Sequence, residues 1–373
     1  MSLTSLPAAS GSASTSPDPA EAFRILTRGD VRGALARADP VATIEAALRA
    51  HAEGRTVLPA EAYLPWRNAE GAYCRSLAMP GGLFDSDPPI LGMKLINAAV
   101  SNPAAGIPRA GGFTVAFDAE TGRPSLLAEG ALISALRTAC YTVASLRVLG
   151  PERFARMAIL GCGYLARVHV ELIERYFPDV TQLDVHDVRT AAAQALVDHW
   201  TRLPGRTATV HEQPRTAVAE SPVVITLTTS DTPYLLESWL PKEVFIAHVS
   251  LDDLTADVLQ DADIFVDDID LVRDNPRRIL GRLLNEGGVV QRPDTGRAGL
   301  LGTLGEVLTG AIPAVRPDGR RVVSNPFGMA VLDLALLRLV QQAAAEQDLG
   351  VPVDLTREAP AREVLAQLAG GLR

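Results

Sequence analysis

The first third of the chain combines helical and strand-like spacing of apolar residues. Residues 20–55 carry apolar side chains at helical spacing, and Asp30 and Asp39 are positioned as helix starters, with Pro40 suited to a first helical position. A proline-containing passage over 59–89 precedes the short apolar run LGMKLINAAV, which contains one lysine. FTVAF and RPSLLAEG flank DAETG, and this pattern predicts two strands joined by a turn. The region is therefore predicted to be α+β with an antiparallel sheet.

Beyond residue 132, apolar strands alternate with helices. ISALRTACYTVASLRVLG predicts a long helix ended by Gly150, and ARMAILGCGYLARVHVELIERYF predicts a strand, a glycine turn and a helix. Further strands are predicted at TQLDVHDV, SPVVITLTTS, VFIAHVSL and IFVDD, with helices at RTAAAQALVDHW and behind the N-P-F-G turn of SNPFGMAVLDLALLRLVQQAAAEQ. Such alternation is typical of a parallel sheet covered on both faces. The predicted fold class is therefore α/β, with a Rossmann-type doubly wound parallel sheet plus a smaller α+β part.

Composition narrows the possible classes of protein. The length of 373 residues suggests two domains, and residues 1–20, rich in Ser, Thr, Pro and small residues, are predicted to be a disordered tail. A net charge of −9 argues against nucleic acid as a partner, which needs a basic footprint. Three cysteines without metal-ligand spacing favour a reducing, cytoplasmic compartment and no metal site. We expect no membrane span and no signal peptide, because apolar runs stop well short of about 20 residues.

A dinucleotide-binding motif follows the strand MAIL. Gly161-Cys162-Gly163-Tyr164-Leu165-Ala166 matches G-x-G-x-x-G/A and opens the next predicted helix. The first glycine permits the tight turn, the second lets a pyrophosphate approach the backbone, and Ala166 lets the helix pack closely on the strand. We therefore expect Gly161, Gly163, Tyr164 and Leu165 to contact the cofactor.

An acidic residue ends the next predicted strand. Asp187 lies 21 residues after Ala166, which suits a carboxylate that binds the adenosine ribose hydroxyls and favours NAD over NADP. Arg189 is a second candidate for this end of the cofactor, because an arginine there could accept a 2′-phosphate. Later in the chain, Thr228 lies in ITLTTS at the carboxyl end of a strand, the edge that faces the ligand in doubly wound sheets. We expect it to contact the nicotinamide half.

Together these segments resemble the ornithine cyclodeaminase and mu-crystallin superfamily. The resemblance runs from about residue 23 to about residue 344 and is carried by HAEGRTVLP, GMKLINAAVSNPAAGIPRA, FDAETGRPSLLAEG, ISALRTA, ILGCGYLARVH and SNPFGMAVLDLAL. It implies an NAD-binding Rossmann domain over 135–321. It also implies a smaller substrate-binding and dimerisation domain over 21–134, completed by 322–373, and hence a homodimer. The expected ligands are NAD and a small amino-acid-like substrate.

One branch of the superfamily is the most similar. RSLAMPGG, HVSLDDL and DADIFVDDID are similar to N-(2-amino-2-carboxyethyl)-L-glutamate dehydrogenases of 2,3-diaminopropionate biosynthesis, which supplies siderophores and peptide antibiotics. The resemblance implies NAD-dependent oxidation at the glutamate α-carbon and hydrolysis of the imine to 2-oxoglutarate and L-2,3-diaminopropionate. Ser250-Leu251 stands where cyclodeaminases usually carry a glycine-rich turn. An ornithine or lysine cyclodeaminase, an amino-acid dehydrogenase or imine reductase, and a ligand-binding protein remain the alternatives.

The resemblance also implies which residues carry chemistry. Lys94 lies in an apolar strand, where an ammonium is costly without a partner. The matching family lysine lines the substrate site, so Lys94 is expected to be a catalytic residue that binds the substrate carboxylate or assists proton transfer. Arg75 and Arg137 match arginines that bind the substrate carboxylate, a role that suits the planar guanidinium. The family places an acid–base residue after the strand FIAHVSL, where Asp252 and Asp253 both stand. Asp253 fits the branch pattern better, and Asp252 is a candidate helix cap.

Overall fold

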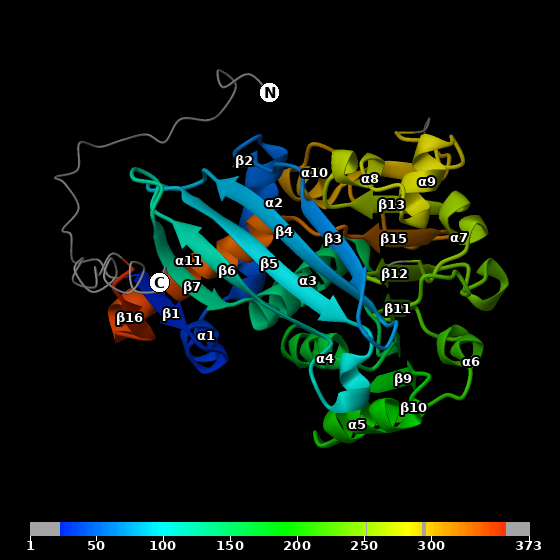
Figure 1. The fold of residues 1–373 in the computed structure, drawn as a ribbon. Coiled ribbons are helices and arrows are strands. Elements are labelled where there is room, and N and C mark those ends of the chain that lie inside the picture. Colours follow the sequence, from blue (N-terminus) through cyan, green and yellow to red (C-terminus); the bar gives the residue numbers. More distant parts are fainter. Residues whose placement is uncertain (1–22, 251, 293–295, 356–373) are drawn as a thin grey trace, which may run out of the picture.

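The computed structural model describes residues 23–250, 252–292 and 296–355 as two eight-stranded sheets with helices between and around them (Figure 1). The predicted tail over 1–20 lies outside the described residues. Sheet A has the order β16-β1-β7-β6-β5-β4-β2, with β3 paired to β4. Its strands are β1 (Phe23–Leu26), β2 (Thr56–Val57), β3 (Ala62–Arg67), β4 (Tyr73–Leu83), β5 (Ile90–Ala99), β6 (Ala110–Phe117), β7 (Pro124–Glu129) and β16 (Val351–Val353).

Sheet B is entirely parallel, as the apolar strand runs predicted. Its order is β10-β9-β8-β11-β12-β15-β13-β14, so the chain leaves β8 in one direction for β9 and in the other for β11. This reversal is the switch point at which doubly wound sheets bind ligands. The strands are β8 (Arg156–Leu160), β9 (Gln182–His186), β10 (Thr207–Val210), β11 (Val223–Thr226), β12 (Val244–His248), β13 (Ala262–Val266), β14 (Gly299–Thr303) and β15 (Arg321–Asn325).

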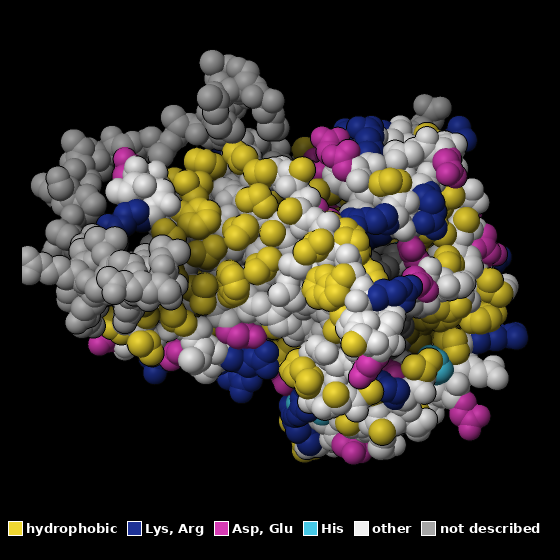
Figure 2. All heavy atoms as spheres, viewed as in Figure 1, with side chains coloured by type: hydrophobic (Ala, Val, Ile, Leu, Met, Phe, Trp, Pro, Cys, Tyr) yellow, Lys and Arg dark blue, Asp and Glu magenta, His cyan; other side chains and the backbone are white. Residues whose placement is uncertain are grey.

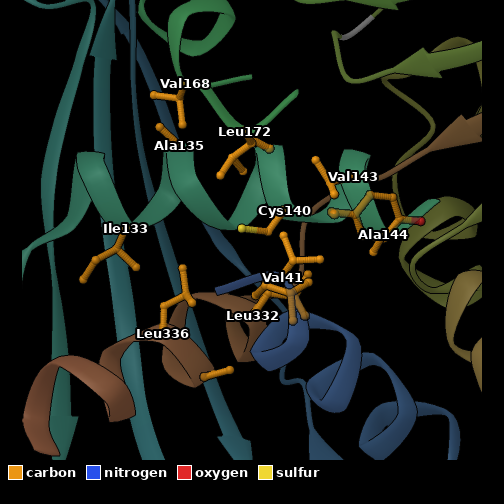
Figure 3. Packing of buried hydrophobic residues seen from close by; sticks show 14 of the residues in the cluster. Val41, Ile133, Ala135, Cys140, Val143, Ala144, Val168, Leu172, Leu332 and Leu336 are labelled. Carbon is orange, nitrogen blue, oxygen red and sulfur yellow. The ribbon is translucent and has the colours of Figure 1, made fainter. Parts of the chain in front are cut away.

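One long helix joins the two sheets. In Figure 3, α3 carries Ile133, Cys140 and Val143 into an apolar cluster with side chains from α2, α4 and α11. Helix α3 is apolar and long enough to cross a membrane, but 72% of the relevant window is buried inside the protein, as in a core helix. The helices are α1 (Arg28–Leu35), α2 (Pro40–Ala52), α3 (Gly130–Leu149), α4 (Tyr164–Tyr176), α5 (Thr190–Thr201), α6 (Pro214–Val218), α7 (Ala256–Gln260), α8 (Ile269–Arg273), α9 (Ile279–Asn285), α10 (Leu304–Thr309) and α11 (Ala330–Gln347), with short 3-10 turns at Asn102–Ala105 and Glu237–Trp239.

The N-terminal region differs from the prediction in three respects. β1 is a strand where helical spacing was expected, because it pairs with the distant β7 and β16. Its pairing with β7 is parallel, so sheet A is mixed. Asp39 caps α2 as predicted, whereas α1 is capped by Thr27, and Asp30 completes the capping box from inside the helix. The proline-containing passage contains β3, with Pro65, and the long β4, with Pro80. Among the described strands β3 pairs with β4 alone, so it is an edge strand, where a proline is tolerated.

We propose that the chain divides into two domains, and two elements show where the boundaries between them can lie. The proposed limit between residues 134 and 135 falls inside α3, which packs on elements of both sheets. The proposed limit at residue 321 falls inside β15, which pairs with β12 and β13 of sheet B. We therefore propose that the chain returns to the first domain after Asn325, where α11 begins to pack on β4 and β5 of sheet A.

Candidate active site

A buried charged cluster joins sheet A to two helices. Lys94 of β5 is 2% exposed, and its Nζ lies 2.9 Å from Oδ2 of Asp333 on α11. Nε of Arg137, on α3, lies 3.4 Å from the same oxygen. Thr114 of β6 stands opposite Lys94 in the antiparallel ladder. Two of the predicted site residues are thus brought together, by an aspartate that the sequence reasoning did not single out.

Two cations, Lys94 and Arg137, lie beside one carboxylate in this cluster. Burial has the largest effect on the pKa of Lys94. Burial lowers the pKa of Lys94 to about 8; Asp333 opposes this shift and Arg137 adds to it. Among the described residues, Asp333 Oδ1 and Thr114 Oγ1 are buried without a hydrogen-bond partner. The three side chains at ion-pair distance therefore carry one more positive than negative charge, while the buried Asp267 acts on Arg137 from farther away. With its unused polar atoms, this is the arrangement expected of a site for an anionic group.

The N-P-F-G turn places the Arg137 guanidinium. Both oxygens of Asp267 accept backbone N–H groups from this turn, 2.9 Å from Phe327 and 2.6 Å from Gly328. Gly328 has a φ of 104°, and a Cβ there would lie 3.1 Å from an Arg137 Nη atom. The positive φ favours glycine at this position, and a Cβ would also push the close guanidinium aside by a few tenths of an ångström. The turn after β15 therefore lies directly against the Arg137 guanidinium.

The two candidate acids after β12 have different environments. Asp253 is fully buried, and its two oxygens accept hydrogen bonds from the hydroxyls of Thr228 (2.5 Å) and Ser250 (2.7 Å). Burial raises the pKa of Asp253 against the opposing effect of these hydroxyls. Asp252 accepts the backbone N–H of Ile279 at 2.6 Å. Asp252 thus caps a helix, as the sequence suggested, but the helix is the distant α9.

The glycine loop between β8 and α4 fits a dinucleotide. Gly161 has a φ of 89°, and a Cβ there would lie 2.7 Å from the backbone carbon of Leu227 after β11. A Cβ at Gly163 would meet nothing within 4 Å, so the helix N-terminus is open to a phosphate. These observations fit the roles expected of the two glycines in binding pyrophosphate.

The acid after β9 is tied to this loop. Asp187 accepts the backbone N–H of Cys162 at 2.7 Å with one oxygen and that of Arg189 at 2.8 Å with the other. Arg189 is exposed beside it, with Nε 3.7 Å from Asp187. Tyr164 is 48% exposed at the start of α4. Burial raises the pKa of the Cys162 thiol to about 12, which fits a small residue of the turn rather than a nucleophile.

Arg75 and a second arginine, Arg278, lie farther along the region where sheet A meets sheet B. The sequence had not indicated Arg278. Arg75 of β4 stands opposite Ala98 of β5 and makes no hydrogen bond or ion pair with any residue that the structure describes. Arg278, between α8 and α9, stacks on the Phe327 ring with 4.4 Å to its centroid. No described group of His, Cys, Asp or Glu side chains has the arrangement of a metal site.

Asp333 and Arg278 carried weak signals in the sequence. Asp333 is an isolated acid in the apolar run MAVLDLAL, and this run could have indicated a partner for the buried Lys94. Arg278 lies in the loop DNPRRI, where arginines are ordinarily exposed. Only the packing of this loop on the N-P-F-G turn distinguishes Arg278 from its neighbours.

Comparison with known proteins agrees with this geometry. N-((2S)-2-amino-2-carboxyethyl)-L-glutamate dehydrogenase of Staphylococcus aureus is 30% identical over 312 residues, which are 83% of this chain and 91% of the relative. Alanine dehydrogenase of Archaeoglobus fulgidus is 24% identical over 338 residues, which are 89% of this chain and 98% of the relative.

Solved structures share the architecture. The crystal structure of CmnK matches with a TM-score of 0.84 at 49% identity and covers 91% of this chain and 100% of that one. The Δ(1)-pyrroline-2-carboxylate reductase of Thermococcus litoralis, in complex with NADH and L-proline, matches with a TM-score of 0.77 at 21% identity, over 88% and 100% of the two chains. Residues 22–348 match the family described as ornithine cyclodeaminase/mu-crystallin. The chain therefore belongs to the ornithine cyclodeaminase/mu-crystallin family.

Proposed function

We propose that this protein oxidatively cleaves N-(2-amino-2-carboxyethyl)-L-glutamate to 2-oxoglutarate and L-2,3-diaminopropionate, as a step in making a siderophore or peptide-antibiotic precursor. At the coarser level, the chain is an NAD-dependent oxidoreductase. The observation that carries the proposal of an amino-acid substrate is the cluster of Lys94, Arg137 and Asp333, which has one more positive than negative charge and is buried between the sheets. Support also comes from the similarity to the Staphylococcus aureus dehydrogenase.

The proposed chemistry needs a hydride acceptor, a carboxylate anchor and a route for protons. The glycine loop and Asp187 would hold NAD, which would supply the acceptor for a hydride from the glutamate α-carbon. The bond from that carbon to nitrogen becomes an imine, to which water adds, and the resulting carbinolamine breaks its C–N bond to give 2-oxoglutarate and the free amine. The overall reaction consumes one NAD and one water and releases one proton.

Residues of this chain would orient the substrate and move protons. Lys94 and Arg137 would bind the α-carboxylate, because their cluster has one more positive than negative charge. Asp253 would take up the proton through the Thr228 hydroxyl that it already binds. The raised pKa of Asp253 favours this role, since it brings the carboxyl closer to the working pH.

We further propose a homodimer formed through the outer face of sheet A. Apolar side chains spread over this face in Figure 2. On β3, Tyr63 turns toward the Arg277 guanidinium, so strand alternation turns Leu64 and Trp66 outward. They are 63% and 43% exposed, and exposed apolar patches mark association surfaces. Sedimentation analysis of the Leu64→Asp variant should then show a monomer. We also keep a cytoplasmic location as a proposal; Cys74, Cys140 and Cys162 are all free and buried.

The decisive experiment mixes the purified protein with excess NAD and separate amino acids. N-(2-amino-2-carboxyethyl)-L-glutamate, ornithine, lysine and alanine form the panel, and absorbance follows the reduced nicotinamide. We expect stoichiometric NADH and 2-oxoglutarate with the first compound alone. Ammonia release from ornithine or lysine without NADH accumulation would instead identify a cyclodeaminase. NADH with alanine would identify an amino-acid dehydrogenase, and silence across the panel would favour another imine substrate or ligand binding.

A further inference from the structure

A loop of sheet B closes onto the edge of sheet A beside the buried cluster. This loop, residues 274–278, joins α8 to α9. The Arg277 guanidinium lies 3.9 Å from the centroid of the Tyr63 ring on β3, and Arg277 forms an ion pair with Glu61 at 3.3 Å. The loop therefore holds the next residue, Arg278, at the junction between the sheets.

Contacts hold the Arg278 guanidinium in place but leave some of its N–H donors without a partner among the described residues. Its Nη atoms donate to the carbonyls of Pro326 (3.2 Å) and Phe327 (3.4 Å), and its guanidinium lies on the Phe327 ring. Asp252 anchors the following residue, Ile279, through the backbone. Two of five guanidinium N–H groups are thus engaged, and no carboxylate in the described part of the chain forms an ion pair with Arg278. The side chain is held in place with donors to spare.

Arg75 faces the same space from sheet A. Side chains two and four positions apart share a face of a strand, so Arg75 shares the face of Met79, which pairs with Lys94. Gly81, on the same face, lies against α11: a Cβ there would be 3.3 Å from Ala330. At about 3.3 Å per residue, Arg75 is roughly 13 Å along the sheet from the Lys94 level. Both side chains are long and flexible, so the Arg75 guanidinium and the Lys94 ammonium can lie closer together than the two backbone positions.

The two arginines act on each other electrostatically. Burial lowers the pKa of Arg278 to about 10, Arg75 contributes in the same direction, and Asp267, Asp252 and Glu61 oppose the shift. Like charges that approach in a partly buried site are unfavourable unless an anion joins them. Arg75 has no such partner in the described residues.

We propose that Arg75 and Arg278 form a second anion subsite, which binds a substrate carboxylate remote from the oxidised carbon. The inference rests on the proposed function, whose substrate carries three carboxylates. One would bind at Lys94 and Arg137, and a remote one at this subsite. Alanine, proline, ornithine and lysine have only one carboxylate, so the subsite would select against them. Arg278 is then a specificity-determining residue of the site.

The test measures binding to the protein saturated with NADH, by calorimetry, so that turnover does not interfere. The probes are N-(2-amino-2-carboxyethyl)-L-glutamate and two analogues that each lack one remote carboxylate, N-(2-aminoethyl)-L-glutamate and N-(2-amino-2-carboxyethyl)-L-2-aminobutyrate. We expect the wild type to bind the full compound about 10- to 100-fold more tightly than one of the analogues, as for loss of a charge-assisted pair. Arg278→Gln and Arg75→Gln should each abolish most of that difference. The exposed Arg273→Gln is the matched control.

Each outcome is decisive. Equal binding of all three probes by the wild type, or a difference that survives in both variants, would overturn the subsite. An equal loss of affinity for every probe would show a structural role instead. If Arg278→Gln does not fold, judged by thermal unfolding and NADH binding, Arg75→Gln alone decides. If the wild type discriminates among the probes but does not oxidise the full compound with NAD, the proposed function fails and the subsite stands.

Discussion

Two charged clusters lie where sheet A meets sheet B, and each has an excess of charge of the opposite sign. Lys94 and Arg137 share the single carboxylate of Asp333, which leaves a net positive charge in a buried place. Asp253 is bound by neutral hydroxyls and forms no ion pair with any described residue, so its ionised form leaves a net negative charge. An amino acid carries a carboxylate and an amine, and each cluster has the charge that suits one of them. We therefore propose that complementary imbalance, rather than neutral pairing, prepares this region for an amino-acid substrate.

The largest expected effect comes from removing a positive charge from the cluster of Lys94, Arg137 and Asp333. Lys94→Met should lower kcat/KM for the amino-acid substrate by about 30- to 4,000-fold, because truncating one partner of a buried charge pair costs roughly 2–5 kcal/mol. The exposed Lys242, the other lysine of the chain, provides Lys242→Met as the matched control. Steady-state kinetics with thermal unfolding would separate lost binding from lost folding. A folded Lys94→Met enzyme with near-normal kcat/KM would show that this cluster does not bind substrate.

Removing the negative side should affect turnover more than binding. Asp253→Asn is expected to lower kcat by about 100- to 1,000-fold, in the range of general acid–base catalysis. Asp252→Asn is the matched variant, since Asp252 is engaged by the N–H of Ile279 and its amide oxygen can still accept that bond. Asp252→Asn should therefore lower kcat much less than Asp253→Asn does. The reverse ranking of the two variants in kcat would transfer the acid–base role to Asp252.

The pKa of Lys94 predicts a pH dependence on the positive side alone. The folded-state value of about 8 lies below the ordinary value of 10.5, so the ammonium is lost as the pH rises through about 8. The inhibition constant of 2-oxobutyrate, which has no amine, should then rise about tenfold per pH unit above pH 8. Asp333→Asn should move this limb to lower pH, because Asp333 opposes the lowering of the Lys94 pKa.

Two results would contradict the predicted pH dependence. A constant inhibition constant between pH 6 and 9.5 would mean that the Lys94 ammonium is not needed for carboxylate binding. The same limb in Asp333→Asn as in the wild type would mean that Asp333 does not act on Lys94. Asp318→Asn, at an exposed acid, is the control for the loss of one surface charge.

The smallest expected effect concerns the hydroxyl cradle of Asp253. Thr228→Val removes one hydrogen bond to the carboxylate, so the pKa of Asp253 should rise further and the acidic limb of the kcat profile should move to higher pH. We expect a change in kcat of about three- to tenfold near neutral pH. Thr229→Val, at the exposed neighbour, should leave the profile unchanged. Identical profiles for the two variants would remove Thr228 from the proton route.

Much of the parallel sheet could be predicted from the sequence. Its strands are short apolar runs such as VVIT and VFIAH, whose burial is nearly complete in the structure, and local pattern is a strong signal there. In sheet A the signal was weaker. β1 has only four residues and is defined by pairing with β7 and β16, about 100 and 330 residues away. Local pattern does not encode pairing across such separations.

The candidate site divides in the same way. The glycine loop and Asp187 follow from spacing within one βα unit, so the sequence alone located them. Lys94 and Arg137 were singled out, but their shared partner Asp333 comes from a helix about 200 residues later. Arg278 resembles any loop arginine until the loop packs on Phe327.

The sequence by itself determined the α/β class, the parallel strands, the glycine loop after β8 and the family. These depend on short-range spacing, which the local backbone enforces. Only the tertiary structure decided which charges meet. The meeting of β5, α3 and α11 gave Lys94 and Arg137 one shared acid, and the meeting of β11 and β12 gave Asp253 its hydroxyls. Charge balance in a buried site depends on neighbours in space, and burial then sets the pKa of each group.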